Sequence, residues 1–102
     1  MGSVMTAVKH WTVDVFIGEH DGRTHAEARL HTNDITSLAG IGQARLHPAD
    51  KDIPEIGDEL AVARALSDLG HRLLLTAAAD IQAASGRPVH LSQWLVRRPV
   101  WQ

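Results

Sequence analysis

The segment LAGIGQARLH, from Leu38 to His47, decides the fold that this sequence predicts. Small or apolar residues alternate there with mostly polar ones, which is the pattern of a β-strand with one buried face. The buried face is expected to carry Leu38, Gly40, Gly42, Ala44 and Leu46. Because its two glycines lack side chains, a helix that covers this face can approach the strand closely.

Two earlier segments alternate in the same way and predict two further strands, over Lys9–Ile17 and Arg23–His31. The dipeptide Asp21-Gly22 between them is a strong turn signal, so the two strands are expected to be antiparallel neighbours. The inward positions are expected to be Trp11, Val13, Val15 and Ile17 on the first strand, and Thr24, Ala26, Ala28 and Leu30 on the second.

A long helix is predicted from about Pro54 to Ala84, ending at Ser85-Gly86. Apolar residues recur in it at spacings of three and four, which defines one buried stripe. This stripe is expected to contain Val62, Leu66, Leu69, Leu73, Ala77 and Ile81. Gly70 in the helix interior costs roughly 1 kcal/mol relative to alanine, so we expect a second close contact there.

The predicted fold is therefore α+β, of order β-β-β-α: a three-stranded antiparallel meander with one long C-terminal helix on one face. It forms a single domain over residues 9–86. Residues 1–8 are taken as an N-terminal extension, and whether Met1-Gly2-Ser3 is native stays open. Residues 87–102 form an irregular tail, rich in arginine and tryptophan, that is either a packing strap or an arm for a partner.

The helix is longer than the sheet it is expected to cover. About 28 helical residues span about 42 Å, whereas strands of about nine residues span about 30 Å. The overhanging segment LLLTAAADI, from Leu73 to Ile81, is apolar nearly all round and therefore requires burial. We expect a homodimer whose interface includes Leu73, Leu74, Leu75, Ile81 and Trp94; the alternative is that the tail folds back over the helix.

Composition excludes several classes of protein. The 102 residues carry a net charge of −2, so the chain as a whole is not attracted to nucleic acid or anionic lipid. The absence of cysteine excludes disulfides, cysteine zinc sites and thiol catalysis. Without a long apolar run or a signal-peptide pattern, we expect a cytoplasmic protein that does not enter a membrane.

Histidines are the only group that suggests a metal site. His25 and Glu27 share the outward face of the second predicted strand, but His31 is about 20 Å from His25 along an extended strand. A zinc site needs three or four converging ligands, so neither a metal nor a cofactor is predicted. A small metal- or ligand-binding protein that uses His25 and Glu27 is the alternative function, and a pH sensor built from the outward histidines is a further hypothesis.

Catalysis is not expected either. The serines lie in no nucleophile motif, and no pair of carboxylates is arranged for acid–base chemistry. The sequence Gly40-Ile41-Gly42 lacks the third glycine and the following helix of a dinucleotide fingerprint. The sequence therefore predicts a protein that is not an enzyme.

The stretches WTVDVFIGEHDGRTHAEARL, GIGQARLHPADKDIPEIGDELAVARALSDL and LLLTAAADI resemble a small actinobacterial family of domains of unknown function. The resemblance spans residues 9–84 and is most specific over PEIGDELA and ARALSDL. It implies a β-β-β-α fold like that of double-stranded-RNA-binding domains (dsRBD-like), and it implies dimers. It also implies a link of some members to hypoxia or dormancy and a likeness to ribosome-hibernation factors. It supplies no catalytic residue.

The expected function is a non-enzymatic, homodimeric interaction module, a stress or dormancy accessory that contacts the ribosome or another protein. The ribosome rests on the resemblance alone. The expected partner surface is the open sheet face, with Phe16, His25, Arg29, Ile41 and Arg45. Duplex RNA is not an expected partner, because Glu55, Asp58 and Glu59 place negative charge at the helix start where phosphate would dock.

Overall fold

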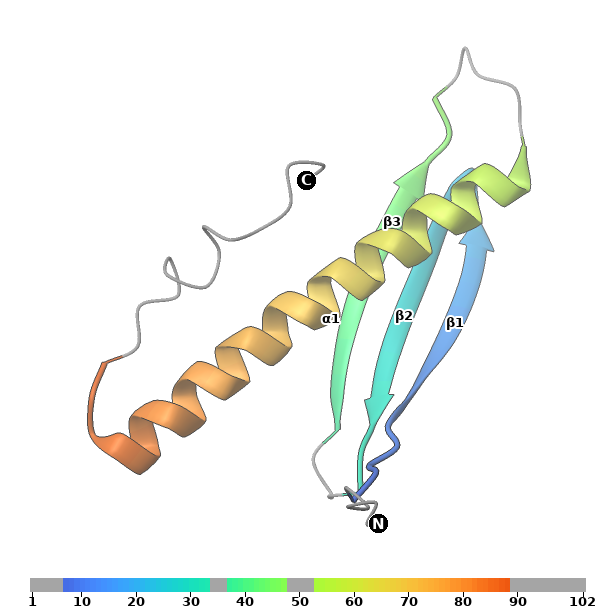
Figure 1. Cartoon of the computed structure of the whole chain (residues 1–102). Coiled ribbons are helices and arrows are strands. Elements are labelled where there is room, and N and C mark those ends of the chain that lie inside the picture. Colours follow the sequence, from blue (N-terminus) through green and yellow to red (C-terminus); the bar gives the residue numbers. More distant parts are fainter. Residues whose placement is uncertain (1–6, 34–36, 48–52, 89–102) are drawn as a thin grey trace, which may run out of the picture.

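The computed structural model describes residues 7–33, 37–47 and 53–88, and it confirms the predicted α+β order. Three strands, β1 (Thr12–His20), β2 (Arg23–His31) and β3 (Leu38–Arg45), form an antiparallel sheet in that order. The helix α1 (Pro54–Ser85) crosses one face of this sheet, mainly over β2 and β3 (Figure 1). Trp94 and most of the predicted tail lie outside the described residues.

The turn between β1 and β2 fixes the register of the sheet. Asp21 and Gly22 both have positive φ, 51° and 74°, as a two-residue type I′ hairpin turn requires. The turn sets His20 opposite Arg23, and the pairing continues to Thr12 opposite His31. The first strand is thus shifted relative to the predicted Lys9–Ile17, because pairing from the turn extends it through His20 and leaves Trp11 outside.

The contact between β3 and α1 is made by backbone rather than by side chains. A Cβ atom on Gly40 would lie 2.3 Å from the Ala65 carbonyl oxygen, and one on Gly42 would lie 2.2 Å from the Ala61 carbonyl oxygen. Such distances are far below van der Waals contact, so no other residue fits at either position. The close approach predicted from these two glycines is confirmed.

This close approach changes which helical residues are buried. The buried positions of α1 are Ala61, Ala65 and Leu69, whose backbone lies directly against the glycines of β3. The predicted stripe was wrong at Leu66 and Ile81, which are exposed, while Val62 and Leu73 pack at the margin of the core. The contact predicted at Gly70 was also wrong, since among the described residues nothing outside the neighbouring helix backbone lies within 4 Å of a Cβ placed there.

The resulting core is built from small side chains. Its buried members are Ala26, Ala28, Leu30, Ala44, Ala61, Ala65 and Leu69. Among the described residues no large side chain is fully buried. On β1 the side chains of Val13, Val15 and Ile17 lie on the face that α1 crosses, opposite the buried residues of β2, yet all three are exposed. The predicted buried face of the first strand is therefore oriented correctly but not covered by the residues that the structure describes.

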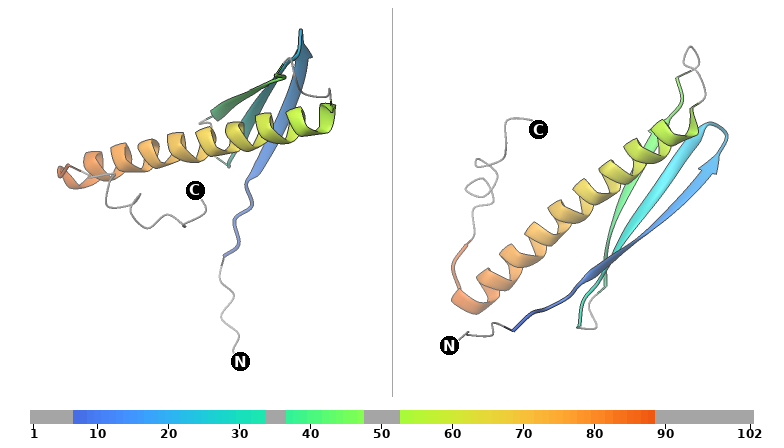
Figure 2. Two further views of the ribbon diagram at one scale, coloured as in Figure 1. Left: turned by 90° about the horizontal axis from the view of Figure 1, so that it is seen from above. Right: turned by 45° about the vertical axis from the view of Figure 1, so that its right-hand side comes forward.

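The C-terminal end of α1 agrees with the prediction. Gly86 adopts a left-handed conformation with φ 71°, and its N–H donates to the Gln82 carbonyl over 2.8 Å. The 32 residues of α1 span about 48 Å. The helix therefore extends well past the strands, as predicted (Figures 1 and 2). No helix in the described part of the chain is long and apolar enough to cross a membrane.

The strand β3 ends earlier than predicted, at Arg45 rather than His47. Leu46 still donates its N–H to the Gly22 carbonyl over 2.9 Å, but its side chain is exposed rather than buried. This last hydrogen bond ties the end of β3 to the β1–β2 turn, and the chain then leaves the sheet towards α1.

Gly42 is packed against α1 and Gly70 is exposed within it, so alanine substitutions at the two positions should change stability in opposite directions. Gly42→Ala should lower the free energy of unfolding by about 3 kcal/mol or more, because the new methyl group meets helix backbone that cannot move aside. Gly70→Ala should raise it by about 1 kcal/mol, because Gly70 is exposed within a helix. Urea unfolding of both variants measures the two effects, and equal stability of Gly42→Ala and the parent chain would contradict the packing described.

Candidate functional site

The outer face of the sheet is the face opposite α1, and it is the candidate site. It is formed by alternate residues of the three strands: Thr12, Asp14, Phe16 and His20 of β1; Arg23, His25, Glu27, Arg29 and His31 of β2; and Ile41, Gln43 and Arg45 of β3. All five residues of the predicted partner surface, Phe16, His25, Arg29, Ile41 and Arg45, lie on this face. No described segment of the chain covers it (Figure 2).

Two apolar side chains stand in the middle of the outer face. Phe16 lies opposite Glu27 on β2, and Glu27 in turn lies opposite Ile41 on β3. Phe16 and Ile41 are each 57 % exposed, which is unusual for large apolar side chains on strands. Glu27 between them is only half-buried and pairs with Arg29. The centre of the face thus offers two apolar contacts on either side of an ion pair.

The acidic groups of the outer face are already paired. Glu27 forms its ion pair with Arg29, which also donates from Nη1 to Ser37 Oγ over 2.9 Å. Asp14 Oδ2 lies 2.9 Å from His31 Nε2. On this face, the arginines without an acidic partner among the described residues are Arg23 and Arg45.

Arg23 and Arg45 face each other directly across β2 and β3. Two like charges at directly opposed positions destabilise a sheet, and both side chains are exposed. An anionic group placed between them would remove this repulsion. The arginine pair therefore adds a cationic end to the apolar centre of the outer face.

The histidines do not converge on one point. His25 lies opposite Gly18 and Gln43, and His31 lies six residues further along the same strand beside Asp14. At the end of β1, His20 Nε2 lies 3.0 Å from Asp21 Oδ2. Within the described residues no group of three or more histidine or acidic side chains could hold a metal ion. Of the pair predicted for the alternative function, Glu27 is engaged by Arg29 rather than by His25.

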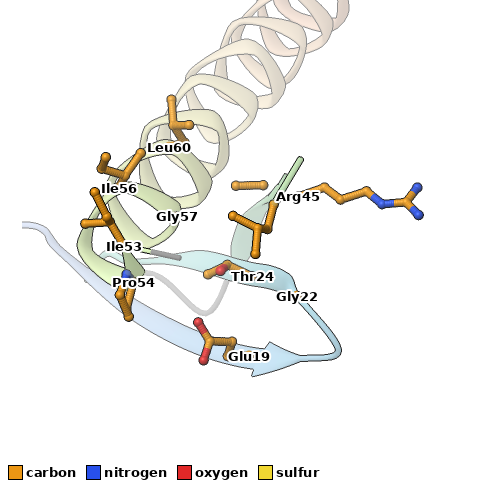
Figure 3. A pocket seen from close by; sticks show the side chains of 11 residues that line it. Glu19, Gly22, Thr24, Arg45, Ile53, Pro54, Ile56, Gly57 and Leu60 are labelled. Atoms are coloured by element: carbon orange, nitrogen blue, oxygen red, sulfur yellow. The ribbon is translucent and has the colours of Figure 1, made fainter. Parts of the chain in front are cut away.

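A cavity of about 370 Å³ lies between the β1–β2 turn and the start of α1 (Figure 3). Apolar side chains of Ile53, Ile56 and Leu60 line it together with Glu19 and the buried Thr24. The Arg45 side chain extends away from it in Figure 3. Sequence reasoning missed this cavity. Gly57 also lines it and lets the first turn of α1 approach Thr24, whose Oγ1 would be 2.9 Å from a Cβ at that position.

Polar side chains of α1 cover the outer edge of β3, a second feature that sequence reasoning missed. Arg64 Nη1 donates to the Gln43 carbonyl over 2.7 Å, and the N–H of Ile41 donates to Asp68 Oδ2 over 2.9 Å. Arg72 Nε donates to the same Asp68 oxygen over 2.9 Å. The available signal was the spacing of Arg64, Asp68 and Arg72, four apart and flanking the buried stripe.

The predicted dimer surface on α1 is only partly free. Leu73 and Leu74 are half-buried within the chain, whereas Leu75 and Ile81 are 44 % and 43 % exposed. Ala77 and Leu73 also line a shallow depression with Trp11, which lies just before β1. Because Trp94 is outside the described residues, the structure locates four of the five residues predicted for this interface.

The chain is similar to proteins of mycobacteria. A family model described as Rv2632c-like matches residues 9–90. Uncharacterized protein Mb1767 of Mycobacterium bovis is 55 % identical over 84 residues, which cover 82 % of this chain and 88 % of that protein. Uncharacterized protein Rv2632c of Mycobacterium tuberculosis is 51 % identical over 77 residues, covering 76 % and 82 %. The crystal structure of Rv2632c aligns with a TM-score of 0.73 at 47 % identity, covering 81 % of this chain and 98 % of that one.

The carboxylate of Asp68 should make the stability of the fold depend on pH. The N–H of Ile41, and after it Arg72, stabilise the carboxylate and hold its pKa below the ordinary value of 3.8. A carboxyl group whose pKa is depressed in the folded state stabilises the fold above its unfolded pKa, and this contribution is lost as the pH falls through the folded pKa. Asp68→Asn should therefore lower stability at about pH 7, and the difference from the parent chain should shrink below pH 3.8.

Urea midpoints of both proteins across this pH range measure the effect. Asp80→Asn is the matched control, since Asp80 is an exposed aspartate of the same helix without a described ion pair. A difference for Asp68→Asn that stays constant through the acid range would contradict the assigned role of its charge.

Proposed function

We propose that this chain, which belongs to the Rv2632c-like family, is a non-enzymatic homodimeric interaction module that binds a partner through its outer sheet face. The observation that carries the proposal is the exposure of Phe16 and Ile41 on either side of the Glu27–Arg29 ion pair. Solvated strand faces normally carry polar residues at such positions. Two large apolar groups on a face that no described segment covers favour contact with another molecule.

The charge of the face supports a partner with anionic groups. Arg23 and Arg45 form the cationic end, and the two acidic residues of the face are engaged by Arg29 and His31. A ribonucleoprotein surface offers both phosphate groups and apolar protein groups, so the ribosome is the partner we propose. The family resemblance gives the same candidate and a role in stress or dormancy. Duplex RNA alone is not proposed, because the start of α1 is acidic at Glu55 and Glu59.

The small core supports a homodimer. A domain of about 100 residues buries only about 60–70 % of the surface of its unfolded chain. In this chain the buried positions are largely alanines, while Val13, Val15, Leu75 and Ile81 remain exposed. A second copy that covers such side chains would supply the apolar burial that one chain lacks.

Charge reversal on the outer face tests the proposed partner. In co-sedimentation with ribosomes, Arg45→Glu should weaken binding at moderate salt. Over a series of salt concentrations, the plot of log affinity against log salt should become less steep by about one unit, because one phosphate contact is lost. Phe16→Ala should weaken binding without changing the slope. Arg87→Glu is the matched control, an exposed arginine beyond α1 that should have no effect.

Absence of binding by the parent chain would overturn the ribosome as partner. Equal weakening by Arg45→Glu and Arg87→Glu would overturn the outer face as the contact surface, because it would show only a general effect of net charge.

A further inference from the structure

The two edge strands of the sheet, β3 and β1, differ in the hydrogen bonding of their outward backbone groups. On β3 the helix provides partners for two outward backbone groups, since Asp68 accepts from the N–H of Ile41 and Arg64 donates to the Gln43 carbonyl. On β1 no described residue provides such partners. Exposed edge strands carry a row of unpaired donors and acceptors that bind another strand readily, and natural proteins cover or interrupt them. Within the described part of the chain, the edge at β3 is therefore protected and the edge at β1 is open.

The register shows which residues of β1 face the open edge. On β3 the N–H of Leu46 points inward to the Gly22 carbonyl, and the N–H of Ile41 points outward to Asp68, so even-numbered residues bond towards β2. Bonding alternates along antiparallel strands. The even-numbered residues of β2 therefore bond to β3, and its odd-numbered residues bond to the even-numbered residues of β1. The backbone N–H and C=O groups of Val13, Val15 and Ile17 then point to the free edge.

The same three residues also carry the uncovered side chains of β1. They lie opposite Leu30, Ala28 and Ala26 on the face that α1 crosses, and they are 40 %, 39 % and 48 % exposed. A strand added at this edge would therefore gain backbone hydrogen bonds and apolar contacts from the same residues. The exposed end of α1 offers apolar side chains but no unpaired strand backbone, so β1 is the stronger contact surface.

The sequence of β1 complements itself. An antiparallel twofold axis at Val15 places Val15 opposite its copy, Val13 opposite Ile17, and Asp14 opposite Phe16. An axis at Asp14 would oppose two aspartates, and an axis at Phe16 would oppose Val13 with Glu19. Only the axis at Val15 keeps the three apolar residues opposite apolar residues and separates like charges. This self-complementarity indicates a second copy of the chain as the added strand.

We propose that two copies of this chain join through antiparallel pairing of β1 with β1 around a twofold axis at Val15. The two three-stranded sheets then continue as one, with both helices on one face and both outer faces on the other. This inference rests on the homodimer in the proposed function and deepens it by assigning the contact to β1. It also doubles the outer surface that a partner meets.

Cysteine crosslinking tests the axis, because the chain contains no cysteine of its own. Asp14 and Phe16 bond towards β2, so across the new edge they form a non-hydrogen-bonded pair with Cα atoms about 4.5 Å apart, within disulfide reach. Asp14→Cys and Phe16→Cys chains are prepared singly, mixed under reducing conditions until subunits exchange, and then oxidised. Mass spectrometry distinguishes the mixed disulfide from either symmetric one.

The expected result is the mixed disulfide in about half of the dimers, the share that random exchange of subunits gives, with little crosslinking of either variant alone. Gln43→Cys is the control, since Gln43 lies on the same face but on the protected edge strand. A symmetric disulfide of Asp14→Cys or of Phe16→Cys as the main product would overturn the axis at Val15.

Light scattering on the uncrosslinked parent chain separates failure of this inference from failure of the homodimer. A mass of 11.1 kDa, that of one chain, would overturn the homodimer itself and the pairing with it. A dimer that forms no disulfide in any mixture would overturn only the pairing through β1. Dissociation of the dimer by Leu75→Ser and Ile81→Ser, with no mixed disulfide, would assign the contact to the end of α1.

Discussion

The structure depends on a contact that contains no side chains. Gly40 and Gly42 place the backbone of β3 directly against the backbone of α1 at Ala61 and Ala65, too close for any Cβ on the strand. The contact sets the rotation of the helix, so that alanines and Leu69 face the sheet. It also brings Arg64 and Asp68 within reach of the backbone at the edge of β3. The fold, the protected edge and the composition of the core all follow from it.

The same contact explains why large apolar side chains remain outside. A helix that lies this close to β3 covers β2 and β3 but leaves β1 largely open, and most of the residues buried beneath it are alanines. No described segment of the same chain then covers the apolar surface of Val13, Val15 and Ile17. Small domains have little stability to spare, so this surface is a strong physical reason for association.

Sequence patterns predicted the order of elements, the glycine contact and the grouping of Phe16, His25, Arg29, Ile41 and Arg45 on one face. These features follow from a period of two and a turn at Asp21-Gly22, which are local properties. The buried stripe of α1 was predicted wrongly, because side-chain size suggested Leu66 where the tight contact requires Ala65. The hydrogen bonds of Arg64 and Asp68 and the cavity beside Thr24 depend on the distance between helix and sheet, which no local pattern specifies.

In this account one chain is an incomplete unit: a sheet with one protected edge, one open edge and an outer face suited to a partner. The mass of the protein in solution tests that claim most directly. Sedimentation equilibrium at micromolar concentration should give twice the chain mass of 11.1 kDa. A stable species of 11.1 kDa, folded and monodisperse, would contradict the account, because the open edge and the exposed side chains of β1 would then need no second copy.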